Sequence, residues 1–304
     1  MKETVLNIKK VGSIKELHFM MGVPSPLNPL LTIIDHAHTQ NSHQLTQQKL
    51  LLNFYNISIK RSFKGKLKYG KNFYDFDEGT MSFIAPNQII SVDKEQDRNK
   101  DGWSLFFHPD LLSRYPLAKA IKNYGFFSYD VNEALHLSNE EEKLIEVIIQ
   151  NIQQEINSRL DNFSHDVIIS NLELLLSYCN RFYCRQFITR KMATNDLLSN
   201  FENILATFFN NDIAFTLPTV EKLATELNVS AAYLSDMLRN LTGQNTQQHI
   251  HQKLIEKAKE MLTTTNFTVS EIAYQLGFEY SQSFSKLFKS KTNFTALEYR
   301  NSFN

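Results

Sequence analysis

The sequence has little of several residue types that define common protein classes. It contains two cysteines, nine glycines and seven prolines in 304 residues. Two cysteines cannot form a disulfide framework in a chain of this size, and Cys179 and Cys184 both lie in a helix-like run, which favours reduced, buried thiols. The low glycine and proline content argues against a collagen-like or low-complexity chain. This composition predicts a folded intracellular protein.

Long hydrophobic runs and an excess of one charge are also missing. Even the longest uninterrupted apolar stretches are short, such as residues 174–176. Residues 1–10 carry charges but no apolar segment of signal-peptide length. These features argue against a membrane partner and predict a cytoplasmic location. Lys plus Arg equal Asp plus Glu at 32 each, so the net charge alone indicates no nucleic-acid partner.

The common catalytic motifs G-x-S-x-G, H-E-x-x-H and G-x-G-x-x-G do not occur. Residues 65–72 approach a phosphate-binding loop but end in Asn72, which has no hydroxyl for Mg²⁺, so we expect hairpin turns there. His36, His38 and His43 precede the predicted strands without a carboxylate at a convincing spacing; surface histidines are favoured over a metal site. We therefore expect no enzyme activity, no catalytic residues, no metal and no cofactor.

The length predicts two domains with different secondary structure. Residues from about 50 to 107 form short alternating or aromatic runs separated by turn residues, which predicts a small antiparallel β barrel or sandwich. Residues from about 138 to 187 have apolar side chains at helical spacing, which predicts a helical hairpin that begins with a capping box at Ser138. We expect a first domain over residues 1–190, a linker at 191–195 and an all-helical domain over 196–304.

The last third of the chain contains an internal repeat. Residues 219–229 align with 268–278 at an offset of 49, and the offset becomes 50 after the following turn. One extra residue in a turn, with the apolar pattern kept on both sides, is typical of two diverged helix-turn-helix units. We predict these units at 219–241 and 268–291.

Each copy of the repeat is physically consistent with a helix pair. Ala224 and Ala273 lie where two helices must approach closely, and Asn228 and Gly277 follow the first helix, where a left-handed conformation is needed. Thr268 and Glu271 have the spacing of a capping box. Between the copies, apolar residues outline a linker helix of about 14 residues, which would span about 20 Å.

Residues from about 196 to 300 resemble the DNA-binding domain of AraC/XylS-type transcription regulators, and the second copy carries the most specific match. The similarity rests on residues 269–273, Gly277–Phe278, Phe284, residues 288–289 and residues 299–300, with residues 258–262 fitting the linker helix. Three positions depart from the family pattern: Leu254, Asn293 and Ala296. The resemblance implies a C-terminal all-α domain with two helix-turn-helix motifs. The strands and hairpin before it resemble, in architecture only, the family's cupin-like N-terminal sensing domain, so the expected fold is two-domain α+β.

The predicted DNA-contacting residues lie on the outward faces of the second helix in each copy. They are Ala231, Ala232, Ser235, Asp236 and Arg239 in the first copy, and Gln282, Ser283, Lys286, Lys289 and Lys291 in the second. Gln282 can pair with adenine and Lys286 with guanine, while Lys289 and Lys291 suit phosphates. The resemblance places base contacts at Ala232, Ser235, Asp236, Gln282 and Lys286. Residues 280–304 carry four basic and one acidic side chain, so the second copy should supply most of the attraction to phosphates.

Together these patterns predict a sequence-specific transcription regulator that binds double-stranded promoter DNA and senses a signal through its N-terminal domain. A homodimer, a small-molecule effector and RNA polymerase are the expected partners; the ligand-binding residues are unknown. The hairpin faces around Ile148, Ile152, Leu172 and Leu176 are the candidate dimer surface, against the alternative that they pack on their own sheet. Two other functions stay open: a metal-dependent cupin enzyme fused to a DNA-binding module, and an effector-independent DNA binder.

Overall fold

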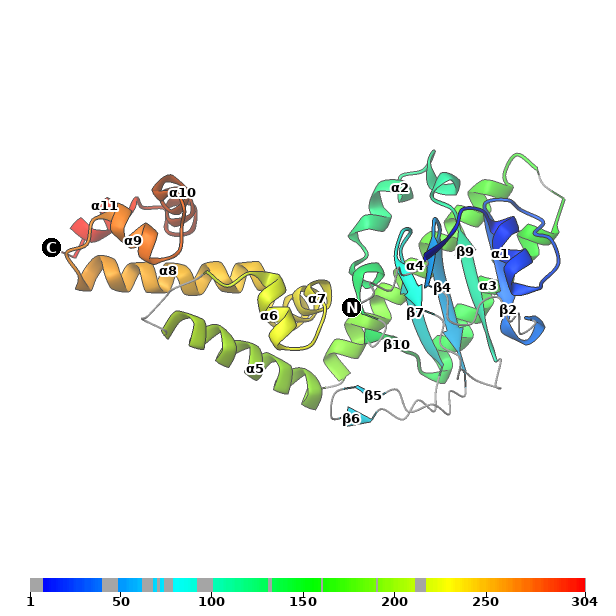
Figure 1. Cartoon of the computed structure of the whole chain (residues 1–304), viewed down its shortest axis with the longest axis horizontal. Helices are drawn as coiled ribbons and strands as arrows, with labels where there is room; N and C mark the ends of the chain where they lie inside the picture. The colour runs from blue at the N-terminus through cyan, green and yellow to red at the C-terminus, as the bar shows by residue number, and fades with distance from the viewer. Residues whose placement is uncertain are drawn as a thin grey trace, which may run out of the picture. The chain divides into compact units, whose positions relative to one another are not determined.

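The protein is described by a computed structural model that covers residues 8–39, 49–61, 68–69, 72–73, 79–91, 101–130, 133–159, 161–189, 191–210 and 217–303. The chain divides into two compact units, Met1–Gln186 and Phe187–Asn304 (Figure 1). The first unit combines β-sheets with helices. The second is helical in every element that the structure describes.

A five-stranded sheet forms the centre of the N-terminal unit. Its strands run in the order β10-β7-β4-β9-β2, and every neighbouring pair is antiparallel. These strands are β2 (Leu31–Asp35), β4 (Tyr55–Lys60), β7 (Thr80–Ile84), β9 (Gly102–Phe107) and β10 (Leu135–His136). A second sheet pairs β1 (Ile8–Val11) in parallel with β3 (Lys49–Leu52), which is antiparallel to β8 (Ile89–Ser91).

The predicted barrel is not confirmed, because no closed barrel is found in the part of the chain that the structure describes. Its strands form open sheets in which β10 and β2 are edges, and no hydrogen-bonded pair closes them into a barrel. The strands β5 (Lys68–Tyr69) and β6 (Asn72–Phe73) pair as a hairpin, as expected in place of a phosphate-binding loop. Strand β2 lies before the predicted start of the strands at about residue 50, and three of its first four residues are apolar.

The two faces of the five-stranded sheet differ in chemistry. One face is apolar and includes Ile57, Ile59, Met81 and Leu105, all fully buried. Helices α3 (Asn139–Asn157) and α4 (Ser164–Thr189) contact this face. The indole of Trp103 donates to Glu146 of α3 at 2.6 Å, and the ring centroids of Phe83 and Tyr183 of α4 lie 5.9 Å apart.

The opposite face carries buried polar side chains that are joined to one another. The hydroxyls of Ser58 and Ser82 lie 2.8 Å apart across neighbouring strands. Ser104 bonds to Nε2 of His36 at 2.8 Å, and Thr32 bonds to Nε2 of His18 at 2.9 Å. His18 belongs to α1 (Ile14–Met21), whose apolar residues join the core with Ile34, Leu52 and Phe106.

The helical hairpin begins as predicted, with Ser138 and Glu141 forming a capping box at the start of α3. The candidate dimer surface on this hairpin is wrong. Ile148, Ile152, Leu172 and Leu176 are at most 3% exposed. They belong to the core of their own unit, because the same stripe that could pair with a second copy is used to cover the sheet.

The predicted linker at residues 191–195 lies within a helix. α4 continues to Thr189, and α5 (Lys191–Asn210) starts at the first linker residue. The boundary between the compact units falls earlier, between Gln186 and Phe187. The segment from 191 to 210 contains neither glycine nor proline, so its polar composition is compatible with continued helix.

The C-terminal unit contains the two predicted helix pairs. α6 (Val220–Glu226) and α7 (Ala231–Thr242) form the first, and α9 (Val269–Gln275) and α10 (Ser281–Thr292) the second. The first helix of each pair has 7 residues and the second has 12. The turns are residues 227–230 and 276–280, so the extra residue inferred from the changing offset lies in the second turn.

The left-handed residues expected after the first helix of each pair are confirmed. Asn228 has φ of 55° and Gly277 has φ of 77°. The second helices end in the same way at Gly243 and Asn293, with φ of 78° and 64°. Asparagine tolerates this conformation better than other non-glycine residues, which explains why Asn293 can stand where glycine is usual.

The helix between the pairs, α8 (Thr246–Thr264), is longer than expected. It has 19 residues and therefore spans about 28 Å. Asn245 and Gln248 form a capping box that starts the helix well before its first apolar residue, Ile250. One helix pair lies near each end of α8 (Figure 1), and the short helix α11 (Ala296–Asn301) packs on α8 beside the second pair.

His36 should make the stability of the N-terminal unit depend on pH. Burial, together with the charge of Lys60, lowers the pKa of His36 to about 4. The unfolded chain takes up this proton near pH 6.5, so the free energy of unfolding should fall as the pH falls from about 6.5 to 4. We expect His36→Gln to reduce the change in the free energy of unfolding over this pH range by roughly 1–2 kcal/mol. The effect is smaller than the full pKa shift implies, because solvent screens the partly exposed ring.

Denaturant unfolding at several pH values between 4 and 8 measures this effect. His38→Gln is the matched control, since His38 is exposed and lies two residues away. Equal pH dependence in the His36→Gln variant and the unmodified chain would contradict the prediction.

Candidate nucleic-acid interface

Helix α10 has two clearly separated faces. Phe284 and Phe288 are fully buried, and Leu287 is partly buried, so one stripe of the helix packs inward. Phe284 contacts Phe278 of the preceding turn, with ring centroids 5.6 Å apart, and Phe288 contacts Tyr299 of α11 at the same distance. This packing fixes which residues of α10 face solvent. They are Gln282, Ser283, Ser285, Lys286 and Lys289, with Lys291 in the last turn.

The three lysines of α10 are available to an external anion. Lys286, Lys289 and Lys291 are exposed, and none forms an ion pair with another residue that the structure describes. Arg300 has a different role. Its Nε donates to the carbonyl of Leu262 at 3.0 Å and its Nη2 to the carbonyl of Phe267 at 2.6 Å, which ties α11 to the end of α8. Of the cations on α10 and α11, those available to an external anion therefore belong to α10.

Helix α7 presents a less accessible and less charged face. Leu234, Met237 and Leu238 are buried, as their spacing predicts. Ser235 is partly buried, and its hydroxyl lies 3.0 Å from that of Thr246, which is fully buried in the first turn of α8. Asp236 accepts a hydrogen bond from Arg239 at 3.0 Å. The one cation of α7 is thus partnered by a carboxylate of the same helix.

The predicted contact residues therefore fall into two groups. All five on α10 are exposed: Gln282, Ser283, Lys286, Lys289 and Lys291. On α7 only Arg239 is exposed, whereas Ala231, Ala232, Ser235 and Asp236 are partly buried. Contact of these ten residues with DNA stays a prediction.

Two exposed tyrosines beside α10 escaped the sequence analysis. Tyr274 and Tyr280 are 60% and 68% exposed, and Tyr280 is the residue immediately before α10. Tyrosine hydroxyls commonly donate to phosphate oxygens. The sequence signal for Tyr280 is weak, because an aromatic residue in a turn between apolar helices is more often part of the core.

The other candidate sites of the sequence are dispersed. His36 bonds to Ser104, and His38 lies 3.4 Å from Asp35, while His43 lies outside the described residues. No group of three or more potential ligands for a metal ion occurs among the residues described. Cys179 is buried, which raises the pKa of its thiol. Within the described ranges, no helix has the length and apolar character needed to cross a bilayer.

Comparison with known proteins identifies the domain that these helices form. A family model described as a helix-turn-helix domain matches residues 223–302, from the end of α6 to α11. The transcriptional activator RhaS of Escherichia coli is 25% identical over 151 residues, which are 49% of this chain and 49% of RhaS. Within the C-terminal unit, residues 223–302 form an AraC-type helix-turn-helix domain.

Two further similarities each cover about a third of the chain or less. The uncharacterized HTH-type transcriptional regulator YobQ of Bacillus subtilis is 34% identical over 83 residues, 27% of this chain and 34% of YobQ. The C-terminal domain of the response regulator yesN from Fusobacterium nucleatum is 34% identical and covers 33% of this chain and 93% of that domain, with a TM-score of 0.30. The chain thus spans about a third of YobQ and half of RhaS.

The three departures from the family pattern leave the AraC-type domain intact. Leu254 is fully buried in the apolar stripe of α8, and Ala296 is 3% exposed at the start of α11. A capping box between Thr295 and Glu298 begins α11 without a proline. Asn293 takes the left-handed conformation that glycine usually supplies.

The Asp236–Arg239 pair should limit the electrostatic contribution of α7. We expect Asp236→Asn to increase affinity for a mixed-sequence duplex and to steepen its dependence on salt by up to about one unit of logarithmic slope, because Arg239 is released to contact phosphate. Fluorescence anisotropy measures both quantities between 50 and 200 mM salt. Over this range we expect the affinity to change by about tenfold or more.

Glu173→Gln is the matched control, since it removes the same charge from an exposed position on α4. Equal gains in affinity for the two variants would mean that only net charge matters, and the specific role of Asp236 would be wrong.

Proposed function

We propose that the chain is a sequence-specific DNA-binding transcription regulator that binds promoter DNA mainly through α10. The observation that supports this most directly is the exposed face of α10. It carries Gln282, Lys286 and Lys289, and neither lysine forms an ion pair with another residue that the structure describes. The AraC-type domain supports the same function, since homologous regulators carry it.

In this proposal α10 lies in the major groove with its N-terminal half toward the bases. Gln282 pairs with adenine through its amide, and Lys286 donates to guanine. Lys289 and Lys291, nearer the C-terminus, bind phosphates and set the position of the helix.

The first helix pair contributes differently in this proposal. Ala231 and Ala232 have methyl groups that suit contact with thymine, whereas Ser235 is held by Thr246. α8, about 28 Å long, separates the two pairs by a length comparable with one turn of DNA, about 34 Å. Each protomer would therefore recognise an asymmetric site across successive major grooves.

The N-terminal unit acts, in this proposal, as the sensing and dimerisation part of a cytoplasmic, non-enzymatic regulator. A small-molecule effector would shift the population between DNA-competent and DNA-incompetent states. RNA polymerase is the expected further partner at the promoter.

Binding sites selected by the full chain from a random duplex library provide the test of DNA recognition. We expect Gln282→Ala and Lys286→Ala each to lose about 1–3 kcal/mol of discrimination at one base pair. Lys289→Ala should weaken binding to all sequences evenly and reduce the salt slope by about one unit.

Lys143→Ala is the control for these lysine variants, because Lys143 is an exposed lysine of α3 in the other unit. Unchanged sequence preference in both Gln282→Ala and Lys286→Ala would show that α10 is not the recognition helix. Absence of any selected site would contradict the proposed function itself.

The proposed homodimer has a revised candidate surface. Leu144 and Val147 of α3 and Leu174 of α4 are 45–55% exposed, in contrast to the buried stripe of the same helices. A contiguous exposed apolar patch marks a protein–protein contact, and we propose that these side chains form one. We expect the chain to sediment as a dimer, and Val147→Lys together with Leu174→Lys to convert it to monomer.

Phe19→Lys is the control, because Phe19 is 79% exposed and belongs to α1 rather than to α3 or α4. A dimer that survives the double substitution would exclude this surface.

A further inference from the structure

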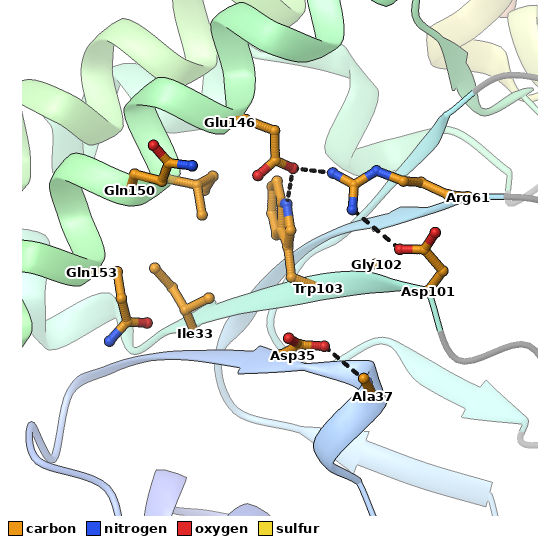
Figure 2. Close-up of a pocket in the computed structure, with 11 residues that line it drawn as sticks. Ile33, Asp35, Ala37, Arg61, Asp101, Gly102, Trp103, Glu146, Gln150 and Gln153 are labelled. Atoms are coloured by element: carbon orange, nitrogen blue, oxygen red, sulfur yellow. Dashed lines mark hydrogen bonds and ion pairs between the residues drawn. The ribbon is translucent and has the colours of Figure 1, made fainter.

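A cavity of about 630 Å³ lies in the N-terminal unit between α3 and one end of the five-stranded sheet (Figure 2). Its sheet side is formed by Ile33 and Asp35 of β2 and by Trp103 of β9. Gln150 and Gln153 of α3 line the opposite side. Figure 2 shows the indole of Trp103 standing between the sheet and Glu146 of α3. The cavity thus combines an aromatic and aliphatic floor with polar groups above it, as small-molecule sites commonly do.

Among the described residues that line this cavity, the one arginine is already neutralised. Arg61 forms ion pairs with Glu142 and Glu146 of α3, and its Nη1 lies 3.2 Å from Asp101. Burial would lower the pKa of Arg61, but the hydrogen bond that Arg61 donates to Glu142 and the charge of Glu146 raise it above its ordinary value. The guanidinium therefore stays charged and fully occupied. An anionic ligand would have to displace a carboxylate from it.

The charge that remains in the cavity is negative. The carboxylates of Asp35, Asp101 and Glu146 line it against the single cation Arg61. Of these three carboxylates, Asp35 is the one that does not pair with Arg61. One oxygen accepts from the backbone N–H of Ala37 at 2.8 Å, the other lies 3.4 Å from His38, and the side chain is 55% exposed. A cation is the ligand that this arrangement favours.

A second cavity of about 290 Å³ adjoins the first and has a different character. The two share Ile33, Asp35 and Gln153, so Asp35 lies where they meet. Away from this junction the second cavity is lined largely by apolar side chains, among them Val23, Leu27 and Ile156. The polar groups of His18 and Thr32, which also line it, are bonded to each other at 2.9 Å. This arm offers apolar contact more than free hydrogen-bonding groups.

We propose that the two cavities together bind a small organic cation with an apolar stem, of the class of primary alkylamines. The ammonium group pairs with Asp35 beside Trp103, whose ring face is suited to a cation. The stem follows Ile33 into the second cavity and contacts Val23 and Ile156. This inference rests on the proposed function, because it assigns the amine as the effector of the regulator.

Binding of hexylamine, 1-hexanol and hexanoate to the full chain tests this proposal, since the three probes share a six-carbon chain and differ in charge. Isothermal titration calorimetry at neutral pH measures each affinity. We expect hexylamine to bind at least about tenfold more tightly than hexanol, and hexanoate not to bind, since its negative charge would lie beside the carboxylate of Asp35. Shortening the amine to butylamine should weaken binding by about fourfold per methylene removed, if the stem is buried.

Asp35→Asn separates the ammonium contact from the rest of the site. The amide oxygen can still accept from Ala37, so the turn after β2 is kept. We expect hexylamine to bind about tenfold more weakly to this variant and to approach the affinity of hexanol. Glu173→Gln, an exposed change of the same charge on α4, should leave the affinity unchanged. Tighter binding of hexanoate than of hexylamine, or equal affinity for hexylamine in Asp35→Asn and the unmodified chain, would overturn the proposal.

The proposal and the proposed function fail in different ways. Selection of DNA sites by a chain that does not bind hexylamine would remove only the amine site. Hexylamine binding through Asp35 by a chain that selects no DNA would retain the site but remove its role as an effector site. If both hold, hexylamine should change the affinity of the full chain for its selected duplex, and Asp35→Asn should abolish that change.

Discussion

The helical unit depends on the burial of one face of α8. α6 and α9 have only 7 residues each, too few to be stable as isolated helices in water. Ile250, Leu254, Ile255, Ala258 and Leu262 are buried along α8, and α7, α9 and α11 all contact this helix. Each helix pair completes its core against it. The separation of the two pairs is therefore set by a rigid element rather than by a loop.

This shared support does not make the two pairs equivalent. In the first pair, the hydroxyl of Ser235 bonds to Thr246 in the opening turn of α8, and Asp236 holds Arg239. In the second pair, two phenylalanines fill the inward side of α10 and leave its lysines outside. Helix α7 is thus suited to contact DNA by its shape, whereas α10 is suited to contact DNA by its charge. An AraC-type domain with a nearly neutral overall composition can still concentrate positive charge on a single helix.

The features that could be predicted from the sequence are local ones. The capping boxes at Ser138 and Thr268 and the left-handed residues Asn228 and Gly277 depend on neighbours within a few positions. The repeat also revealed the extra turn residue, because both copies obey the same short-range rules. The exposed face of α10 followed from the spacing of its phenylalanines.

The features that could not be predicted depend on contacts between distant residues. Arg61 pairs with carboxylates that are 40, 81 and 85 positions away, so no sequence motif announces the cavity beside it. Whether the stripe through Ile148 and Leu172 covers the sheet or a second copy is also decided by tertiary packing. The open arrangement of the sheets, expected to be a barrel, depends on pairings that alternation within single strands does not specify.

The four left-handed positions of the AraC-type domain bear on how such domains diverge. The first pair uses asparagine and then glycine, at Asn228 and Gly243, whereas the second uses glycine and then asparagine, at Gly277 and Asn293. All four positions need the same left-handed backbone conformation, yet asparagine and glycine are exchanged between the two helix pairs. An alignment scored by identity counts two mismatches here, where the physical constraint is the same. Ancestry between such repeats is therefore better traced by backbone conformation than by residue identity.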